Sequence, residues 1–205
     1  MSRELIEESA FRKRIMLHQV WNDVNLSEDK SEESAQMVLT ETDIKDMLIC
    51  NADFSGAEIV RCNVSSVTFK ECYFSYALLL ESVFNNCSFD HCNFVKADLR
   101  GIKCNDCSMN NCDFTRADLT DATLAGVNLT GSKFNWSWLV NTDLRFALLE
   151  AVEFEEAKLI QTKLYNERRF VLGSIDKALV DRADISPEGN GGEMMGKEVF
   201  ELLSK

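Results

Sequence analysis

The sequence is short of the residues and segments that mark several protein classes. It has two histidines, His18 and His91, and no Ser-His-Asp, HExxH or phosphate-loop arrangement. No run approaches the ~18 apolar residues of a membrane-spanning helix, and the charged N-terminus has no apolar segment typical of a secretory signal. These features predict a protein that has no catalytic residues, needs no metal or other cofactor and has no membrane span.

The net charge of the chain is −12. A strongly acidic protein is not expected to bind nucleic acid directly, because phosphates are contacted mainly by lysine and arginine, but it suits a basic partner surface. The eight cysteines, without a secretory signal, favour free thiols in a reducing compartment. We therefore expect a cytoplasmic protein.

The dominant pattern is a repeat with a period of five residues. From Phe54 to Leu164, every fifth residue is apolar. A second column, two residues earlier in each pentad, begins at Ala52 and consists almost entirely of small residues. The other three positions are mostly polar. A step of five residues drifts around an α-helix and alternates faces along a strand. The columns share one interior only if the chain turns once per pentad, which predicts a solenoid.

The pentads resemble those of the pentapeptide-repeat family, whose pattern is roughly A-(D/N)-L-x-x. The resemblance is carried by Ala97-Asp98-Leu99, Ala117-Asp118-Leu119 and Cys92-Asn93-Phe94. It implies an all-β solenoid, a right-handed quadrilateral β-helix with four pentads per coil and about six coils. Residue types support this coil length, because the six residues at steps of twenty from Phe54 to Phe154 are all phenylalanine.

We expect three segments: an N-terminal helix and loop over residues 1–38, the β-helix over 39–166, and a C-terminal helical tail with a flexible linker over 167–205. Helical spacing between Ser2 and Val24 predicts an amphipathic helix that packs on the end or on one face of the rod. Short helices are expected at Ser174–Ala183 and Met194–Leu203. The second is a candidate homodimer contact, as in related proteins, or a helix for a groove on a partner. Its apolar residues are Met195, Val199, Phe200 and Leu203.

Two sets of outward residues are candidate contact surfaces. Exposed apolar patches usually mark contacts, and Trp and Tyr are favoured anchors. The apolar set is Tyr73, Tyr76, Leu78, Leu80, Trp136, Trp138, Val140 and Phe146. The N-terminal helix covering this surface is an equal alternative. The acidic set is Asp98, Asp113, Asp118, Asp121, Glu153, Glu155 and Glu156. Cys104 and Cys107 form a CxxC spacing, which the repeat register explains as two inward residues rather than a metal site.

Two functions fit these features. The first is a rigid scaffold that binds a protein partner. The second is implied by the resemblance, since the best characterised pentapeptide-repeat proteins imitate DNA, bind type II topoisomerases such as DNA gyrase and protect them from quinolones. Over half of the net charge lies outside the repeat, which ranks the scaffold first. Some family members are secreted bacterial effectors, so secretion stays an open alternative to the cytoplasm.

Overall fold

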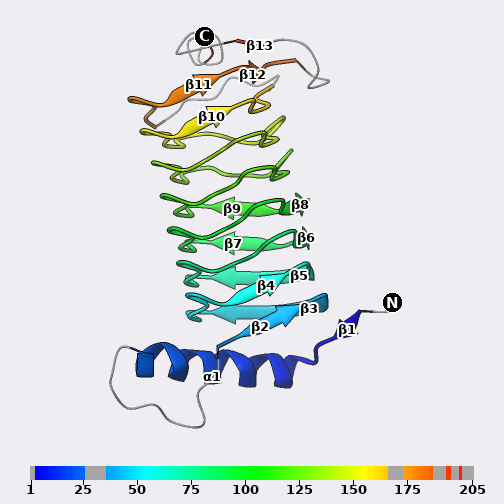
Figure 1. Ribbon diagram of the computed structural model, residues 1–205. Helices are drawn as coiled ribbons and strands as arrows, with labels where there is room; N and C mark the ends of the chain where they lie inside the picture. Colours follow the sequence, from blue (N-terminus) through cyan, green and yellow to red (C-terminus); the bar gives the residue numbers. More distant parts are fainter. Residues whose placement is uncertain (1–2, 26–35, 166–172, 187–192, 195–198, 200–205) are drawn as a thin grey trace.

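A computed structural model of the chain describes residues 3–25, 36–165, 173–186, 193–194 and 199. It is a parallel β-solenoid of about seven turns, drawn as stacked coils in Figure 1. The predicted right-handed quadrilateral β-helix is confirmed.

The coils pair by parallel backbone hydrogen bonds. Ile44 lies opposite Val64 and Phe84 opposite Cys104, so each residue stacks on the one twenty positions later. The strands are β1 Glu4–Leu5, β2 Val38–Thr40, β3 Thr42–Cys50, β4 Glu58–Val60, β5 Asn63–Lys70, β6 Val83–Asn85, β7 Ser88–Asp90, β8 Lys103–Asn105, β9 Ser108–Asn110, β10 Lys158–Ile160, β11 Leu179–Asp181, β12 Ala183–Asp184 and β13 Glu193–Met194. Between β9 and β10 the coils are joined by single bridges such as Asp118↔Trp138.

Each pentad ends in a corner with left-handed backbone. Tyr76, Trp136 and Phe146 have φ values of 58°, 56° and 60°, in the region that L-residues seldom occupy. The corner amide is hydrogen-bonded to the next coil, as between Trp136 N and Glu155 O at 2.8 Å. This confirms one turn per pentad, the condition that the period of five imposed.

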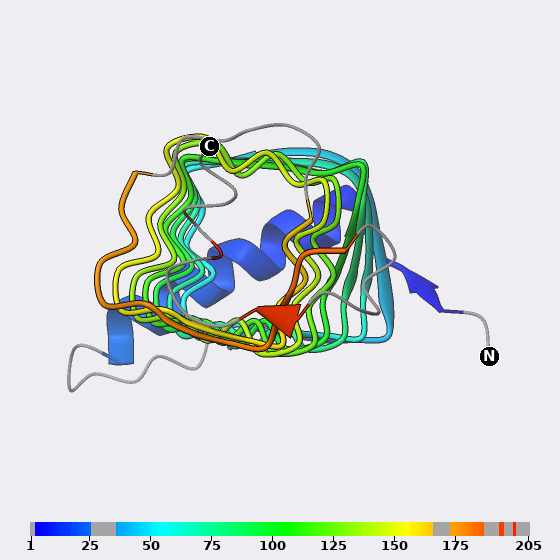
Figure 2. The same ribbon diagram turned by 90° about the horizontal axis from the view of Figure 1, so that it is seen from above.

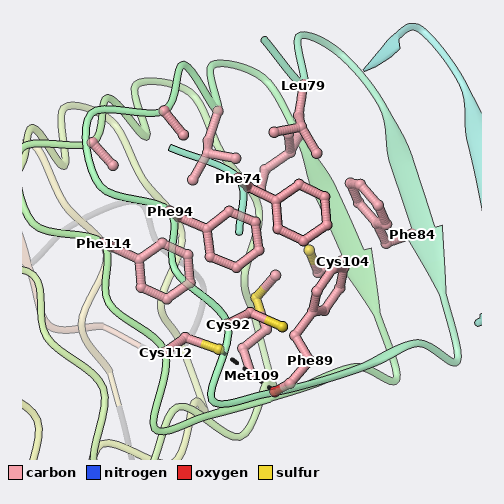
Figure 3. Packing of buried hydrophobic residues seen from close by; sticks show 14 of the residues in the cluster. Phe74, Leu79, Phe84, Phe89, Cys92, Phe94, Cys104, Met109, Cys112 and Phe114 are labelled. Atoms are coloured by element: carbon pink, nitrogen blue, oxygen red, sulfur yellow. Dashed lines mark hydrogen bonds between the residues drawn. The ribbon is translucent and has the colours of Figure 1, made fainter. Parts of the chain in front are cut away.

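The interior is filled by stacked columns (Figure 3). Phe54, Phe74, Phe94, Phe114, Phe134 and Phe154 form one ladder, with successive ring centroids 4.7–5.4 Å apart. Phe69 and Phe89 stack at 4.8 Å on another side. These separations match both the spacing of paired strands and a favourable aromatic contact, so one repeat length satisfies backbone and side chains together.

Helix α1, Glu8–Asn25, closes the N-terminal end of the rod, as Figures 1 and 2 show. Phe11 lies 6.3 Å from Phe54 and continues its ladder, and Ile15 is also buried. His18 accepts a hydrogen bond from Met37 N at Nδ1 and contacts Ser55 O through Nε2, both at 3.0 Å. The helix is therefore an end cap and does not cover the outward apolar residues. It starts later than expected, because Glu4–Leu5 pair with β3 as strand β1.

The helix expected at Ser174–Ala183 is wrong. Ser174 bridges Glu153, and β11 pairs with β10, so this segment is a further coil with its register moved by one residue. The period persists, with Ile175, Val180 and Ile185 at the inward positions and small residues Gly173, Ala178 and Ala183 two before them. The coil was missed because its phase differs by one from the preceding repeats. The expected linker begins at Ser186, and its residues 187–192 lie outside the described residues.

Candidate interaction surface

One face of the rod carries the exposed side chain of Trp138 together with the partly buried apolar side chains of Leu78, Leu80 and Val140. We call it the Trp138 face; its central inward residues run from Ile59 through Leu139 to Leu159. Each coil places two outward residues on it, one before and one after the inward residue. Within residues 58–160 these pairs are Glu58 and Val60, Leu78 and Leu80, Asp98 and Arg100, Asp118 and Thr120, Trp138 and Val140, and Lys158 and Ile160.

A corner column borders this face. We call it the Tyr76 edge; it consists of Tyr76, Lys96, Arg116, Trp136 and Glu156. Two cations, Lys96 and Arg116, lie between the two rings of this edge. Lys96 Nζ lies 4.8 Å from the Tyr76 centroid and donates to its hydroxyl at 2.7 Å. Arg116 Cζ lies 5.8 Å from the Trp136 centroid. Trp136 Nε1 donates to Glu156 Oε2 at 2.9 Å, so ordered contacts hold both exposed rings.

The apolar side chains form two clusters along the face. The first lies around Tyr76, Leu78 and Leu80, and the second around Trp136, Trp138 and Val140. Trp136 and Trp138 are 43% and 46% exposed. Between the clusters lies a charged band in which Arg100 makes two hydrogen bonds to Asp98, at 2.6 and 2.8 Å, and approaches Asp118 at 3.9 Å. The predicted apolar surface is therefore interrupted over two coils.

Two predicted members lie elsewhere on the rod. Tyr73 is exposed on the neighbouring face, in the column that continues to Asn93. Phe146 occupies the corner diagonally opposite the Tyr76 edge, half a coil from Trp136, and its ring meets Tyr165 edge-on at 5.4 Å. Leu148, which the candidate set omitted, is exposed beside it. Phe146 is as exposed as Trp138, at 46%, so it provides a matched control outside the Trp138 face.

The candidate acidic residues do not form one stripe. Asp98, Asp113 and Asp118 are interleaved with bases, and Asp98 is paired with Arg100. Glu153 approaches Lys133 at 4.0 Å and Glu156 approaches Lys177 at 3.4 Å. Asp121 lies at a corner, where it accepts a hydrogen bond from Asn141, and Glu155 is next to the Glu156 corner. Bases thus break the acidic columns of the repeat.

Six of the eight cysteines fill small inward positions, Cys104 fills a large inward position, and Cys50 is exposed. Cys92 and Cys112 stack near Phe94 and Phe114 in Figure 3, with Cys104 nearby. A side-chain hydrogen bond with Cys112 raises the pKa of Cys92 to about 12, and contact with Cys107 and burial raise the pKa of Cys104. These protonated thiols are poor nucleophiles and poor metal ligands. No metal-binding group of three His, Cys, Asp or Glu occurs among the described residues.

One of the four residues proposed for a C-terminal dimer, Val199, lies in the described part of the chain. Val199 is helical, fully buried and part of the chain's own core. Met195, Phe200 and Leu203 lie outside the described residues. No helix in the described part of the chain is both long and apolar enough to cross a membrane.

Comparisons with known proteins agree with the repeat. Residues 82–159 match the family description "pentapeptide repeat region". Similar solved structures include a trypsin-treated form of QnrB1, a plasmid-mediated fluoroquinolone resistance protein, with 20% identity, a TM-score of 0.41 and coverage of 70% of this chain and 72% of that one. HetL from Nostoc sp. strain PCC 7120, involved in heterocyst differentiation regulation, has 16% identity, a TM-score of 0.27 and coverage of 78% and 92%.

A third similar structure is a pentapeptide-repeat protein from the Arabidopsis thaliana thylakoid lumen, with 17% identity, a TM-score of 0.19 and coverage of 73% and 70%. These structures are too distant to assign a function. The comparison with curated proteins gave no match. The matched family region and the five-residue register of the coils identify residues 82–159 as a pentapeptide repeat region.

Proposed function

We propose that this chain is a non-catalytic scaffold that binds a protein partner through the Trp138 face and its Tyr76 edge. One observation carries the proposal: Trp136 and Trp138 are nearly half exposed on a backbone held by hydrogen bonds from both neighbouring coils. Tryptophan is favoured at interface hot spots. A rigid backbone also lowers the conformational entropy lost on binding.

The order of the Tyr76 edge supports the same role. Its rings already contact Lys96, Arg116 and Glu156, so their orientation is set before a partner arrives. Pre-ordered aromatic anchors lose fewer rotamers on binding. Because the exposed surface also carries paired charges, we expect a partner that combines apolar contacts with polar groups, as protein interfaces do.

The test is affinity capture with the immobilised wild-type protein and matched variants, read out by quantitative mass spectrometry. A partner bound by the Trp138 face is recovered by the wild type and by Phe146→Ala. Its recovery falls at least tenfold with the Trp136→Ala/Trp138→Ala double variant. Equal recovery by all three proteins contradicts the proposed surface, and purified partner must then reproduce the difference in direct binding.

DNA mimicry of a type II topoisomerase is the second candidate that the family resemblance raised. The ion pairs of Asp98, Glu153 and Glu156 weigh against it, because a DNA mimic needs acids that are available to basic residues of the enzyme. Supercoiling by purified DNA gyrase, with and without a quinolone, decides between them. Inhibition or drug protection at micromolar protein, lost when Asp113 and Asp121 become Asn, would replace the scaffold proposal.

We also propose a reducing compartment, such as the cytoplasm, for this binding. The eight free cysteines support it, because disulfides are rare in reducing compartments. The measurement is the fraction of reduced thiols in protein isolated under rapid alkylation.

A further inference from the structure

The outward residues of the Trp138 face form a pattern that is complementary to itself. In each coil, one outward residue precedes the inward side chain and one follows it. Leu78 is paired in this way with Leu80, and Trp138 with Val140, so both residues of each pair are apolar. In the first coil of the band between them the pair is an acid and a base, Asp98 beside Arg100, and in the second coil it is Asp118 and Thr120.

This pairing matters when two identical faces meet. In a two-fold dimer, residue i of one copy contacts residue j of the other and the reverse. If the axis runs parallel to the rod, each coil faces the same coil of the second copy, and left and right are exchanged. The residue before the inward side chain then faces the residue after it. Leu78 meets Leu80, Trp138 meets Val140, and Asp98 meets Arg100 of the second copy.

The charged band distinguishes this arrangement from the antiparallel one. If the rods are antiparallel, each column of one copy faces the same column of the second copy, with the coils in reverse order. Asp98 of one copy then faces Asp118 of the other, and Lys96 lies near Arg116. Like charges placed together at an interface are unfavourable. In the parallel arrangement the two Asp98–Arg100 pairs lie head to tail. At the rim, Arg116 faces the corner of Asp121, whose carboxylate accepts a hydrogen bond from Asn141.

We propose that the Trp138 face binds the same face of a second copy of this chain, with the two rods parallel and their coils in register. The proposal rests on the function proposed above, since it names the partner of that surface. The outer coils fit less well, because Glu58 and Lys158 would face Val60 and Ile160. The face is also only about three residues wide, so the interface belongs to the small class below about 1,200 Å². We expect a micromolar dissociation constant.

The first experiment is sedimentation of the full chain across a concentration series. The wild type is expected to reach twice the 23.3 kDa mass of one chain. Trp138→Asp is expected to stay monomeric, whereas Phe146→Asp, at an equally exposed position on the other side of the rod, dimerises like the wild type. A monomeric wild type, or equal dimerisation of both variants, overturns the inference. The capture experiment above would still test the scaffold separately.

Exchanging the charges of Asp98 and Arg100 provides a second test, because a variant that fails to fold would not regain dimerisation. Arg100→Asp places acids against acids and should weaken the dimer at least tenfold. Asp98→Arg/Arg100→Asp reverses both charges and should restore it, since each base again faces an acid. The Arg100 side chain is 53% exposed, and unchanged circular dichroism controls for the fold. Failure of the double variant to recover dimerisation overturns the proposed pairing.

Orientation is tested with thiol crosslinking in a Cys50→Ser background, because Cys50 is the exposed cysteine and the other seven are buried. A bis-maleimide with an arm of about 10 Å matches the spacing of packed sheets. A mixture of Leu78→Cys and Leu80→Cys chains should crosslink efficiently. A mixture of Leu80→Cys and Val140→Cys chains, which antiparallel rods would bring together, should not. The reverse preference identifies antiparallel rods and overturns the parallel arrangement.

Discussion

The ammonium nitrogen of Lys158 lies 3.7 Å from the ring centroid of Trp138, one coil along the rod. A cation over an exposed indole stabilises a protein by about 0.5–1 kcal/mol. We therefore expect Lys158→Met to lower the free energy of unfolding by no more than about 1 kcal/mol and to shift tryptophan fluorescence. Urea denaturation measures the first effect. Lys103→Met, in the column on the next face, is the control, and an equal change there would mean that the ring contact contributes nothing.

The phenylalanine ladder is expected to dominate the stability of the rod. Phe94→Ala removes a fully buried ring that stacks on Phe74 and Phe114 at 4.8 and 4.9 Å. It should cost about 3–5 kcal/mol, as large-to-small changes in cores do. Tyr73→Ala, on the outside of the same wall, should cost less than about 1 kcal/mol. Equal losses in urea denaturation would contradict a core stabilised by stacking between neighbours.

The end cap should weaken in mild acid. Nδ1 of His18 accepts a hydrogen bond from Met37 N, so protonation of that nitrogen breaks the contact. Burial lowers the pKa of His18 below its ordinary value of 6.5, although Asp53 opposes the shift. Because the unfolded chain binds the proton more readily, the stability held above pH 6.5 is lost as the pH falls toward the folded-state pKa. Hydrogen exchange of α1 between pH 7.5 and 5 measures this loss.

The control for the cap prediction is His18→Gln, which cannot titrate in this range. Its α1 amides should exchange with the same protection at pH 7.5 and pH 5 after correction for intrinsic rates. If wild type and variant show the same pH dependence, His18 does not control the cap.

Two glycines at corners allow the cost of a left-handed backbone to be measured separately from the cost of a steric clash. Gly126 and Gly131 have φ values of +73° and +71°. A Cβ on Gly126 meets nothing within 4 Å, whereas one on Gly131 lies 2.5 Å from the side-chain oxygen of Asn111. Both Ala variants should lose about 1 kcal/mol from the left-handed backbone. Gly131→Ala should lose more unless Asn111 moves aside, which Gly131→Ala/Asn111→Ala tests by thermal denaturation.

Thiol labelling of the native protein should modify one cysteine and leave the other seven unmodified. Cys50 is exposed, and the other seven are buried. Contact with Cys112 raises the pKa of Cys92 to about 12, so its thiolate is scarce at neutral pH. We expect one alkylated cysteine per native chain and eight in urea by intact mass spectrometry. Rapid native labelling at Cys92 would show that the coils open locally.

Most of the rod could be predicted from residue periodicity. The turn at every pentad follows from the apolar column starting at Phe54, because no regular helix or strand keeps such a column on one side. The number of pentads per coil came from the family resemblance and the phenylalanine ladder. The last coil was missed because Ile175, Val180 and Ile185 keep the period but lie one residue out of phase.

The candidate surface was less predictable than the fold. The register placed Trp138 and Val140 on one face correctly, because outward positions follow directly from the inward column. It could not place α1, whose packing on the end depends on contacts such as Phe11 with Phe54 and His18 with Met37. Nor could charge counts show that Arg100 and Asp98 pair, since that contact depends on side-chain conformation.

The backbone hydrogen bonds between coils run along the rod axis, and α1 and β12 lie at opposite ends (Figure 1). A pulling force applied between these two ends would therefore load the bonds of one coil boundary at a time instead of shearing many together. We expect the rod to peel coil by coil from a loosened end at modest force. As a tether it would yield gradually, although as a spacer under compression it would keep its length.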